Sequence, residues 1–450
     1  MSKRVTILGA GESGTGAALL ARKKGFEVFV SDQGAIKSQY KSTLSEAEIP
    51  FEEGIHTLER ILGSDILIKS PGIPDKAEVV KQAKAAGIEV IDEIEFAFRY
   101  LKGKVIAITG TNGKTTTTLL TYHLLKSAGF SVALAGNVGE SLAAKVAEGD
   151  HDWYVIEISS FQLDGTKTFH PHIGILTNIT PDHLDRYDYR MENYVASKFR
   201  LVANMGSADH FIYYGQDPVV SKEVADHRLV PTSHAVSLEN QASEIYATGT
   251  TMHFELGELT FSILQSETTL KGPHNLLNTM CAVSAAVLAG VGEASIRTSL
   301  KTFVNAPHRL ETVGVIRGVE FVNDSKATNV DSVIYALGSY QQPLVWIAGG
   351  IDKGNDYTVI REAVAQKVKA LICLGKDNSK LFQFFSPVVP RISETQDVKT
   401  LVRMALEQAA AGDVVLLSPA CASFDLFKNY EDRGNQFRAA VQELKKEQEA

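Results

Sequence analysis

The sequence predicts an α/β protein built from three domains. Short apolar segments alternate with helical stretches along almost the whole chain, and two glycine-rich turns each join a predicted strand to a predicted helix. The length of 450 residues also exceeds what one hydrophobic core usually serves, since domains commonly span about 100–200 residues. We expect domains at residues 1–95, 96–305 and 306–450.

The first domain is predicted to be a Rossmann-like nucleotide-binding unit. A buried strand at 4–8 runs into the turn Gly9-Ala-Gly-Glu-Ser-Gly14, and the next strand leads to Asp32. This order of strand, glycine turn, helix and strand is typical of a unit that binds dinucleotides. The other expected elements are helices at 17–24 and 77–86 and strands at 26–30, 65–69 and 89–91.

The strongest single motif is Gly110-Thr-Asn-Gly-Lys-Thr-Thr-Thr117, between a strand at 105–108 and a long helix that begins near Lys114. Backbone N–H groups of such a turn wrap phosphate oxygens, while Lys114 can reach the terminal phosphates and Thr115 can hold Mg²⁺. Ile108 stands where the general P-loop pattern has its first glycine, and the alternative is a helix-capping turn with an exposed lysine. We predict a central P-loop mononucleotide-binding domain for ATP or GTP.

The remaining elements continue the α/β pattern. In the second domain we expect strands at 154–158 and 173–179, a strand-rich segment at 209–266 and a helix at 275–289. In the third we expect strands at 320–323, 343–348, 370–374 and 413–418, with helices between them and a charged helical tail after residue 442.

Composition and charge exclude several classes of function. The net charge of −8 gives no basic field for nucleic acid, and no apolar stretch reaches the roughly 20 residues of a membrane span. No signal peptide is recognisable, so we expect a cytoplasmic protein without membrane insertion. Cys281, Cys373 and Cys421 are too scattered for a disulfide framework or a zinc site, and we expect three reduced thiols.

The glycine turn before Asp32 also supports a rival hypothesis, a NAD-dependent oxidoreductase. That reading gives the P-loop motif no role, and a phosphate-binding first domain need not hold NAD. A non-catalytic nucleotide switch is a third possibility.

Two polar side chains follow strands of the predicted P-loop sheet. Glu157 ends one strand, where an acid commonly helps to fix a metal ion, although it could instead cap the next turn. His183 lies in the loop Asn178-Ile-Thr-Pro-Asp-His-Leu-Asp-Arg-Tyr187, and a single histidine is more often structural than a ligand. Their shared position beside the P-loop makes both candidates for a metal site.

Polar runs also follow the strands of the third domain, at 307–309, 323–329, 349–354 and 418–425. Each could be a capped turn, but together they are expected to form one rim.

Lys198 occupies the apolar stripe of a predicted helix, together with Met191, Tyr194, Val195 and Val202. An inward lysine is anomalous, so we expect a lowered pKa or a modified amine, unless the side chain reaches out to water.

Taken together, these motifs resemble the Mur ligase family. The shared features are the P-loop motif, the 178–187 loop, Gly272-Pro-His-Asn275 with Asn278, the His-Arg pair at 308–309 and the run Asp-Ser-Lys-Ala-Thr-Asn at 324–329, all in the family's order. Within the family the likeness is greatest to members that add D-glutamate, through Ser70-Pro-Gly-Ile-Pro74, Ala135-Gly-Asn-Val-Gly139, Glu157-Ile-Ser-Ser-Phe-Gln162 and Leu417-Ser-Pro-Ala-Cys-Ala-Ser-Phe-Asp425.

The resemblance implies three domains, for a UDP-sugar, ATP and an amino acid, the last one Rossmann-like. It assigns catalysis to Lys114, Glu157, His183 and Lys198. It implies ATP-binding residues Gly110, Thr111, Asn112, Gly113, Lys114, Thr115, Thr116, Asn275, Asn278, Arg309 and Asp324. It implies UDP-substrate residues Gly11, Ser13, Gly14, Thr15, Asp32, Ser70, Gly72, Asn137, Ser159 and His183. It implies D-glutamate residues Lys326, Thr328, Lys353, Ser423 and Tyr430, and metal ligands Thr115, Glu157, His183 and a carbamylated Lys198.

The implied activity is that of an ATP-dependent acid–amino-acid ligase in peptidoglycan precursor synthesis. It would add D-glutamate to UDP-N-acetylmuramoyl-L-alanine through an acyl phosphate, with ATP and two Mg²⁺ sites, and act as a monomer. Another Mur-type or folylpolyglutamate-type amide ligase is the alternative within this chemistry.

Overall fold

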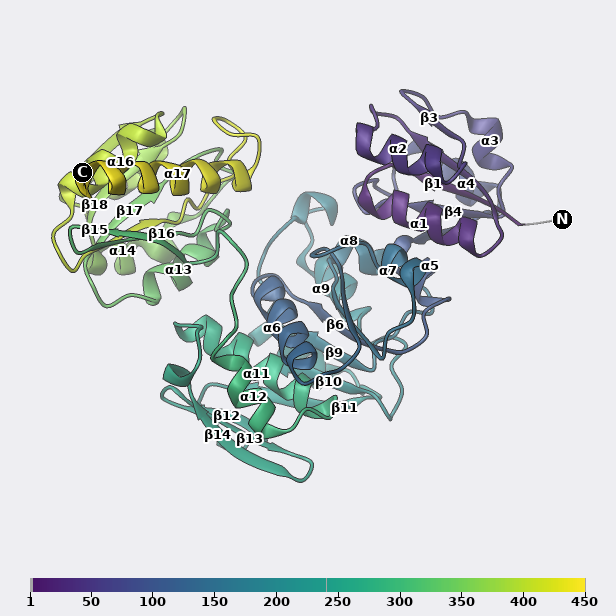
Figure 1. Ribbon diagram of the computed structural model, residues 1–450, viewed down its shortest axis with the longest axis horizontal. Helices are drawn as coiled ribbons and strands as arrows, with labels where there is room; N and C mark the ends of the chain where they lie inside the picture. The colour runs from purple at the N-terminus through teal and green to yellow at the C-terminus, as the bar shows by residue number, and fades with distance from the viewer. Residues whose placement is uncertain (1–2, 240, 450) are drawn as a thin grey trace. The chain divides into compact units, whose positions relative to one another are not determined.

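The computed structural model describes residues 3–239 and 241–449, which form three β-sheets with helices packed on them (Figure 1). The predicted α/β class is therefore confirmed. By their internal contacts the residues divide into two compact units. The first unit, residues 1–269 and 277–303, holds the first two sheets, and the second unit, residues 270–276 and 304–450, holds the third. The exact domain boundaries at 95/96 and 305/306 stay predictions.

The first sheet has five parallel strands in the order β3-β2-β1-β4-β5. Its inner strands are almost continuous runs of buried apolar residues, as expected where helices cover both faces of a parallel sheet. The elements are β1 Arg4–Leu8, α1 Glu12–Lys23, β2 Glu27–Asp32, α2 Ser38–Glu46, β3 Phe51–Glu53, α3 Leu58–Leu62, β4 Ile66–Lys69, α4 Glu78–Ala85, β5 Glu89–Asp92 and α5 Glu93–Phe98.

The second sheet has nine strands in the order β14-β13-β12-β11-β10-β9-β6-β8-β7, and only β12, β13 and β14 are joined by antiparallel pairing. The P-loop strand β6 lies between β8 and β9. The elements are β6 Lys104–Thr109, α6 Lys114–Ser127, β7 Val132–Gly136, α7 Leu142–Glu148, β8 Trp153–Glu157, α8 Ser160–Asp164, β9 Ile173–Leu176, η1 Leu184–Arg186, α9 Met191–Phe199, β10 His210–Tyr214, α10 Pro218–Asp226, β11 Thr232–Ser237, β12 Ile245–Thr248, β13 Thr251–Leu256, β14 Leu259–Leu264, η2 Gln265–Glu267, α11 Pro273–Leu288 and α12 Glu293–Leu300.

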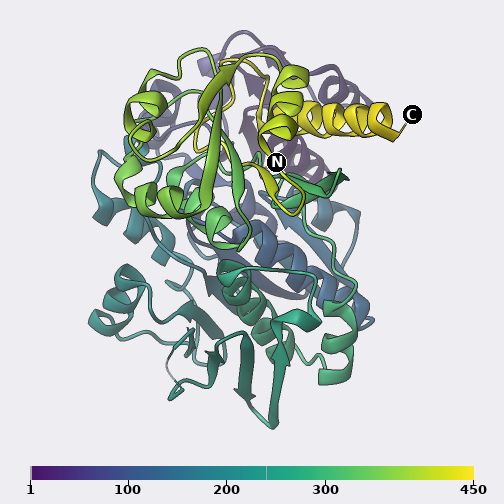
Figure 2. The same ribbon diagram turned by 90° about the vertical axis from the view of Figure 1, so that its left-hand side faces the viewer.

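The third sheet has six strands in the order β15-β16-β20-β17-β18-β19, parallel except for the β15–β16 pair. Helices α16 and α17 pack side by side on one face (Figures 1 and 2), and α13 and α14 pack with η3 on the other. The elements are β15 Glu311–Ile316, β16 Val319–Asn323, α13 Val330–Gly338, β17 Leu344–Ala348, η3 Tyr357–Ile360, α14 Arg361–Lys367, β18 Val368–Leu374, α15 Ser379–Phe385, β19 Ile392–Thr395, α16 Val398–Gln408, β20 Val414–Leu417 and α17 Tyr430–Glu449.

Two expectations about helices were wrong in their bounds. Helix α1 begins at Glu12, not at residue 17, because the second half of the glycine motif is already helical. The C-terminal helix begins at Tyr430, well before residue 442, and buries Phe437, Val441 and Leu444 on one stripe of helical spacing. The helix is therefore part of the folded core as far as Leu444.

Within the first unit, the first two sheets are joined by helix packing. Helix α1 lies against α7, and α5 packs on both. A Cβ added to Gly16 would come within 2.0 Å of the Ser141 hydroxyl oxygen, so the two helices approach closely at that point. The buried Glu93 carboxylate accepts a hydrogen bond from the Ala143 N–H at the start of α7.

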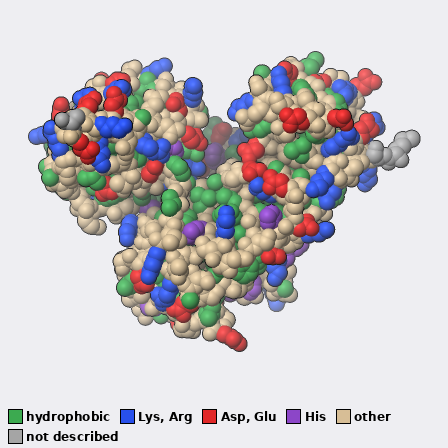
Figure 3. All heavy atoms as spheres, in the orientation of Figure 1, with side chains coloured by type: hydrophobic (Ala, Val, Ile, Leu, Met, Phe, Trp, Pro, Cys, Tyr) green, Lys and Arg blue, Asp and Glu red, His purple; other side chains and the backbone are tan. Residues whose placement is uncertain are grey.

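The described residues contain no helix with the length and apolar character needed to cross a membrane. Acidic and basic side chains are interspersed on the face drawn in Figure 3. The three cysteines are buried free thiols, as predicted.

The turn between β1 and α1 gives a test of packing. A Cβ added to Gly14 would lie 1.8 Å from the Gly9 carbonyl oxygen, whereas one added to Gly11 would meet nothing within 4 Å. Gly14→Ala should lower the free energy of unfolding by about 3 kcal/mol, because backbone must move to admit the methyl group. Gly11→Ala is the matched control and should change it by less than about 0.5 kcal/mol. Urea unfolding followed by circular dichroism measures both, and equal midpoints for the two variants would contradict the packing argument.

Candidate active site

Three motif loops leave the same edge of the second sheet. The P-loop follows β6, Glu157 ends β8, and the 178–187 loop follows β9, and these three strands are neighbours and parallel. The carboxyl ends of parallel strands are where α/β sheets bind ligands. The structure therefore brings the predicted catalytic residues of the first unit to one place.

The P-loop is shaped by two glycines with positive φ, Gly110 at 145° and Gly113 at 86°. Gly113 caps α6, and a Cβ there would lie 2.3 Å from the Asn278 side-chain oxygen, which also accepts a hydrogen bond from Thr117. Asn278 is thus fixed against the start of the nucleotide-binding helix. The predicted ATP residues 110–116 form this turn and the first residues of α6.

The 178–187 loop holds the P-loop in place. The Asn178 side chain accepts a hydrogen bond from the Asn112 N–H at 2.9 Å and donates one to the Asn112 carbonyl at 3.0 Å. Thr111 and Thr180 are joined by two further hydrogen bonds. These hydrogen bonds give the predicted phosphate-binding turn a defined shape.

Two lysines converge on the Gly110 carbonyl oxygen. Lys198 donates to it at 2.8 Å from α9, and Lys114 donates to it at 2.9 Å from α6. Lys198 is 2 % exposed, so the alternative of a lysine reaching out to water is wrong. Burial lowers the pKa of the Lys198 amine well below its ordinary value, and the nearby Lys114 ammonium lowers it further.

Glu157 is 1 % exposed at the end of β8 and accepts a hydrogen bond from the Asn137 side chain at 2.6 Å. The alternative that Glu157 caps the next turn is wrong, because Ser159 caps α8 and pairs there with Gln162. A buried carboxylate and its amide partner thus line the strand end beside Lys198, whose charge the Glu157 carboxylate favours.

His183 is half exposed and directly precedes η1, with a left-handed backbone, φ 52°. Its ring lies 5.2 Å from that of Phe161, and its Nε2 lies 3.5 Å from an Asp182 carboxylate oxygen. In the described part of the chain, no three histidine, cysteine, aspartate or glutamate side chains are gathered closely enough to hold a metal ion.

The predicted UDP residues of the first sheet surround the turn after β1. Both carboxylate oxygens of Asp32 accept backbone hydrogen bonds, from Ala10 at 2.7 Å and Gly34 at 2.8 Å. Asp32 thus shapes the glycine turn itself. Gly14 and Thr15 are buried in α1, Ser13 is half-buried, and Gly11 and Gly72 are exposed beside the half-buried Ser70.

In the second unit, Arg309 and Asp324 lie close together. Asp324 accepts hydrogen bonds from the Ser418 hydroxyl and the Leu310 N–H, and burial raises the pKa of its carboxyl to about 7. The Arg309 cation opposes that rise. Asn275 also belongs to this unit and donates to the Lys271 carbonyl, whereas Asn278, on the same helix, belongs to the first unit.

The predicted D-glutamate residues lie at the carboxyl edge of the third sheet. The loops after β16, β20 and β17 leave neighbouring parallel strands, which confirms that the polar runs at 323–329, 349–354 and 418–425 share one rim. Within it Lys326 lies over the Tyr430 ring at 5.1 Å. Thr328 is half-buried, Lys353 is exposed and Ser423 is buried.

Arg433 was missed by sequence reasoning. Its guanidinium is 1 % exposed and donates to the carbonyls of Ser325, Gly349 and Cys421, one from each of the three loops. The residue lies on the first turns of α17, and the apolar spacing of that helix is the signal that could have found it.

Comparison with known proteins assigns the family. Residues 4–79 match the MurD N-terminal domain, residues 108–286 the Mur ligase middle domain, and residues 308–421 the glutamate ligase domain of Mur ligases. A protein of Cytophaga hutchinsonii named UDP-N-acetylmuramoylalanine–D-glutamate ligase is 50% identical over 99% of this chain and 100% of its own length. This chain belongs to the Mur ligase family. A protein of the same name from Bacteroides thetaiotaomicron is also 50% identical, over 98% of this chain and 100% of its own.

Solved structures show the same fold. The UDP-N-acetylmuramate–alanine ligase of Thermotoga maritima superposes with a TM-score of 0.63 at 16% identity, over 99% of this chain and 100% of that one. The predicted three-domain α/β architecture of this Mur ligase is therefore confirmed.

Asp324 makes the stability of the second unit depend on pH. With a folded-state pKa of about 7 against an ordinary 3.8, the native protein keeps a proton that the unfolded chain has lost. Stability should therefore fall as pH rises from about 4 to 7. Asp324→Asn should remove that fall and raise the free energy of unfolding at pH 8 by about 2–4 kcal/mol over the parent.

Urea unfolding read by the fluorescence of Trp346 tests this, because Trp346 is buried in the core of the second unit and Trp153→Phe makes it the sole tryptophan. The exposed Glu362→Gln is the matched control and should keep the slope. If the free energy of unfolding of the parent protein did not change between pH 4 and 7, Asp324 would be ionised in the folded state.

Proposed function

We propose that this chain joins D-glutamate to UDP-N-acetylmuramoyl-L-alanine with hydrolysis of ATP to ADP and phosphate, in peptidoglycan precursor synthesis in the cytoplasm. The observation that carries the proposal is the 50% identity, over nearly the full length, to relatives whose name states that ligation. The P-loop and the third-sheet rim support it with a site for ATP and a site for an amino acid.

The first step is activation of a carboxylate, because a carboxylate and an amine do not condense in water unaided. The terminal phosphoryl group of ATP passes to the L-alanine carboxylate, which gives an acyl phosphate and ADP. The N–H groups of the P-loop and the Lys114 ammonium would neutralise charge on the phosphates. Asn137, Ser159 and His183 would face the substrate at the carboxyl edge of the second sheet.

In the second step the D-glutamate amine attacks the acyl carbon, and the tetrahedral species collapses to the amide and phosphate. The two D-glutamate carboxylates would be held by Lys326, Thr328, Lys353, Ser423 and Tyr430. Arg433 ties together the three loops that carry these residues, so the pocket is shaped before the amino acid binds.

Mg²⁺ fits the residues of the P-loop sheet. Thr115 offers a hydroxyl at the start of α6, and the buried Glu157 offers a carboxylate at the end of β8. These are oxygen donors of the kind that Mg²⁺ prefers. When bound, the ion adds positive charge beside the transferring phosphoryl group.

A second Mg²⁺ site would use His183 and a carbamylated Lys198. An uncharged amine reacts with CO₂ to give a carbamate and a proton, and burial favours that uncharged form because it lowers the pKa of the Lys198 amine. The carbamate would add an anion near Glu157 and Asp182, and such a gathering of negative charge calls for a cation.

Phosphate release tests the proposed reaction. With ATP and UDP-N-acetylmuramoyl-L-alanine, the purified protein should release phosphate at least about tenfold faster with D-glutamate than with L-glutamate, D-aspartate or L-lysine, since a two-carboxylate pocket discriminates by geometry. UDP-N-acetylglucosamine, which lacks the alanine carboxylate, is the control and should support no release. Release with another amino acid alone would assign a different amide ligase, and tight NADH binding with no release would support the oxidoreductase.

Lys198→Ala should lose most ligase activity, because the carbamate is lost. Acetate should restore part of it by filling the vacated space with a carboxylate, and ATP binding should change little. The exposed Lys222→Ala in α10 is the matched control and should keep full activity. A second readout is a carbamate signal in ¹³C NMR with labelled bicarbonate, expected in the parent and absent from Lys198→Ala. Full activity of the variant would remove Lys198 from the mechanism.

A further inference from the structure

Arg186 connects two loops of the first unit that the proposed reaction uses together. From η1 its guanidinium donates to the carbonyls of Gly72 and Pro71, at 3.4 and 3.3 Å. These carbonyls belong to the loop after β4, which carries the predicted substrate residues Ser70 and Gly72. Because the acceptors are backbone atoms, the two bonds fix the position of the loop itself.

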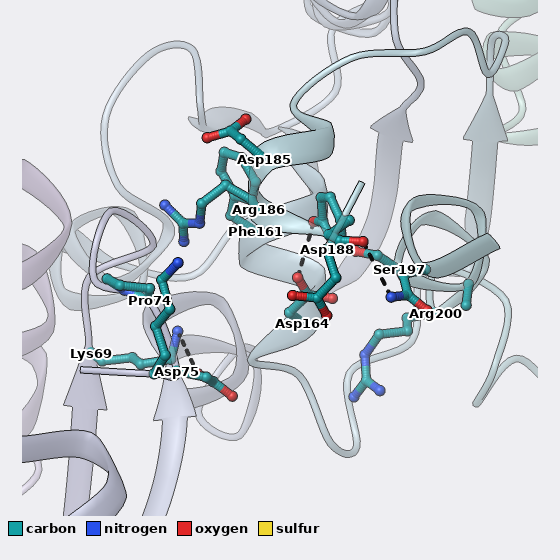
Figure 4. A pocket seen from close by; sticks show the side chains of 14 residues that line it. Lys69, Pro74, Asp75, Phe161, Asp164, Asp185, Arg186, Asp188, Ser197 and Arg200 are labelled. Atoms are coloured by element: carbon teal, nitrogen blue, oxygen red, sulfur yellow. Dashed lines mark hydrogen bonds and ion pairs between the residues drawn. The ribbon is translucent and has the colours of Figure 1, made fainter. Parts of the chain in front are cut away.

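The same guanidinium lies over the Phe161 ring, 4.5 Å from its centre, and Figure 4 shows Arg186 and Phe161 beside each other at the rim of a pocket of about 530 Å³. The Phe161 and His183 rings meet edge to face, with centres 5.2 Å apart and planes at 66°. Phe161 thus contacts both the guanidinium and the imidazole. This arrangement limits where the His183 ring can lie.

Contacts continue from Phe161 into the site. Tyr187 stacks on Phe161 with ring centres 6.0 Å apart, and Tyr194 lies 5.3 Å from Tyr187. The Tyr194 ring lies 4.6 Å from the Lys198 amine, and its hydroxyl lies 3.2 Å from the Thr111 hydroxyl. A row of packed aromatic rings therefore runs from the substrate loop to the P-loop.

We propose that Arg186 is a positioning residue, which with Phe161 holds the 70–74 loop and His183 in one fixed arrangement. The inference rests on the proposed function, since it concerns the UDP substrate of that reaction. Through the 70–74 loop and His183, Arg186 aligns the alanine carboxylate with the phosphoryl group, although it contacts neither. Lysine cannot replace it, because a single ammonium does not lie flat on a ring while donating to two carbonyls.

The test compares Arg186→Ala with Arg190→Ala. Arg190 lies in the same segment, but it is exposed and forms an ion pair at 4.0 Å with the exposed Glu192. The control therefore removes the same charge without removing the contacts of Arg186. Arg186→Ala should raise the KM for UDP-N-acetylmuramoyl-L-alanine about tenfold and lower kcat about tenfold, with the KM for ATP within about twofold. Arg190→Ala should change none of these by more than about twofold, and Arg186→Lys should behave like Arg186→Ala.

Chemical rescue separates positioning from general loss of structure. Millimolar methylguanidinium should restore part of the activity of Arg186→Ala, because it can stack on Phe161 and donate to the two carbonyls, and methylammonium should not. If Arg186→Ala does not fold, Phe161→Leu serves instead. It keeps the carbonyl bonds but removes the ring, so kcat should fall more than the KM for the UDP substrate rises.

Three results would overturn the inference: unchanged kinetics of Arg186→Ala or of Phe161→Leu, an equal rise in KM for all three substrates, or rescue by methylammonium as good as by methylguanidinium. A parent protein that forms no amide from these substrates overturns the proposed function and this inference with it. An active parent with an unaffected variant overturns the inference alone.

Discussion

The carbonyl oxygen of Gly110 accepts hydrogen bonds from Lys114 and Lys198, at 2.9 and 2.8 Å. Two ammonium groups on one acceptor repel each other, and the more deeply buried one loses its proton most easily. The arrangement of the site depends on this repulsion between the two ammonium groups. Lys114 lies at the start of α6, where we propose that phosphate binds, whereas the pKa of the Lys198 amine is lowered. Gly110 itself has a positive φ of 145°, a backbone conformation that other residues rarely adopt.

The strands and the loops that carry the chemistry could be predicted from the sequence because they follow simple physical patterns. Buried parallel strands are near-continuous apolar runs, and polar motifs directly after them must meet at one edge of a sheet. Apart from the segment at 209–266, which was predicted only as strand-rich, the strands that were not predicted are β3, β7, β15 and β19, and these four lie at sheet edges. Strands β3, β15 and β19 lack the continuous apolar run that identifies a central strand. Strand β7 is apolar, but it is rich in alanine and glycine, which are depleted in strands.

Interactions between distant parts of the chain were beyond the sequence alone. The residues around Asn178 do not indicate that its side chain binds the backbone of Asn112. In sequence, Arg433 is indistinguishable from the other charged residues of a polar helix. Gly434 looks like a helix breaker, yet a Cβ there would lie 2.2 Å from the His308 ring, so the position requires glycine. The unusual burial of Lys198 was predictable, because a charged residue rarely occupies the apolar stripe of a helix. Its hydrogen-bond acceptor, the Gly110 carbonyl oxygen, was not predictable.

Burial also changes the chemical reactivity of Lys198 relative to the other lysines of the chain. An exposed lysine is protonated at neutral pH and has no lone pair to offer, so it reacts slowly with electrophiles. Burial lowers the pKa of the Lys198 amine, so a larger fraction of it carries the lone pair at a given pH than in an exposed lysine. A small neutral electrophile such as isocyanic acid should therefore react faster with the Lys198 amine than its charge in water would suggest, so the burial that shapes the site also makes this lysine a point of covalent attachment.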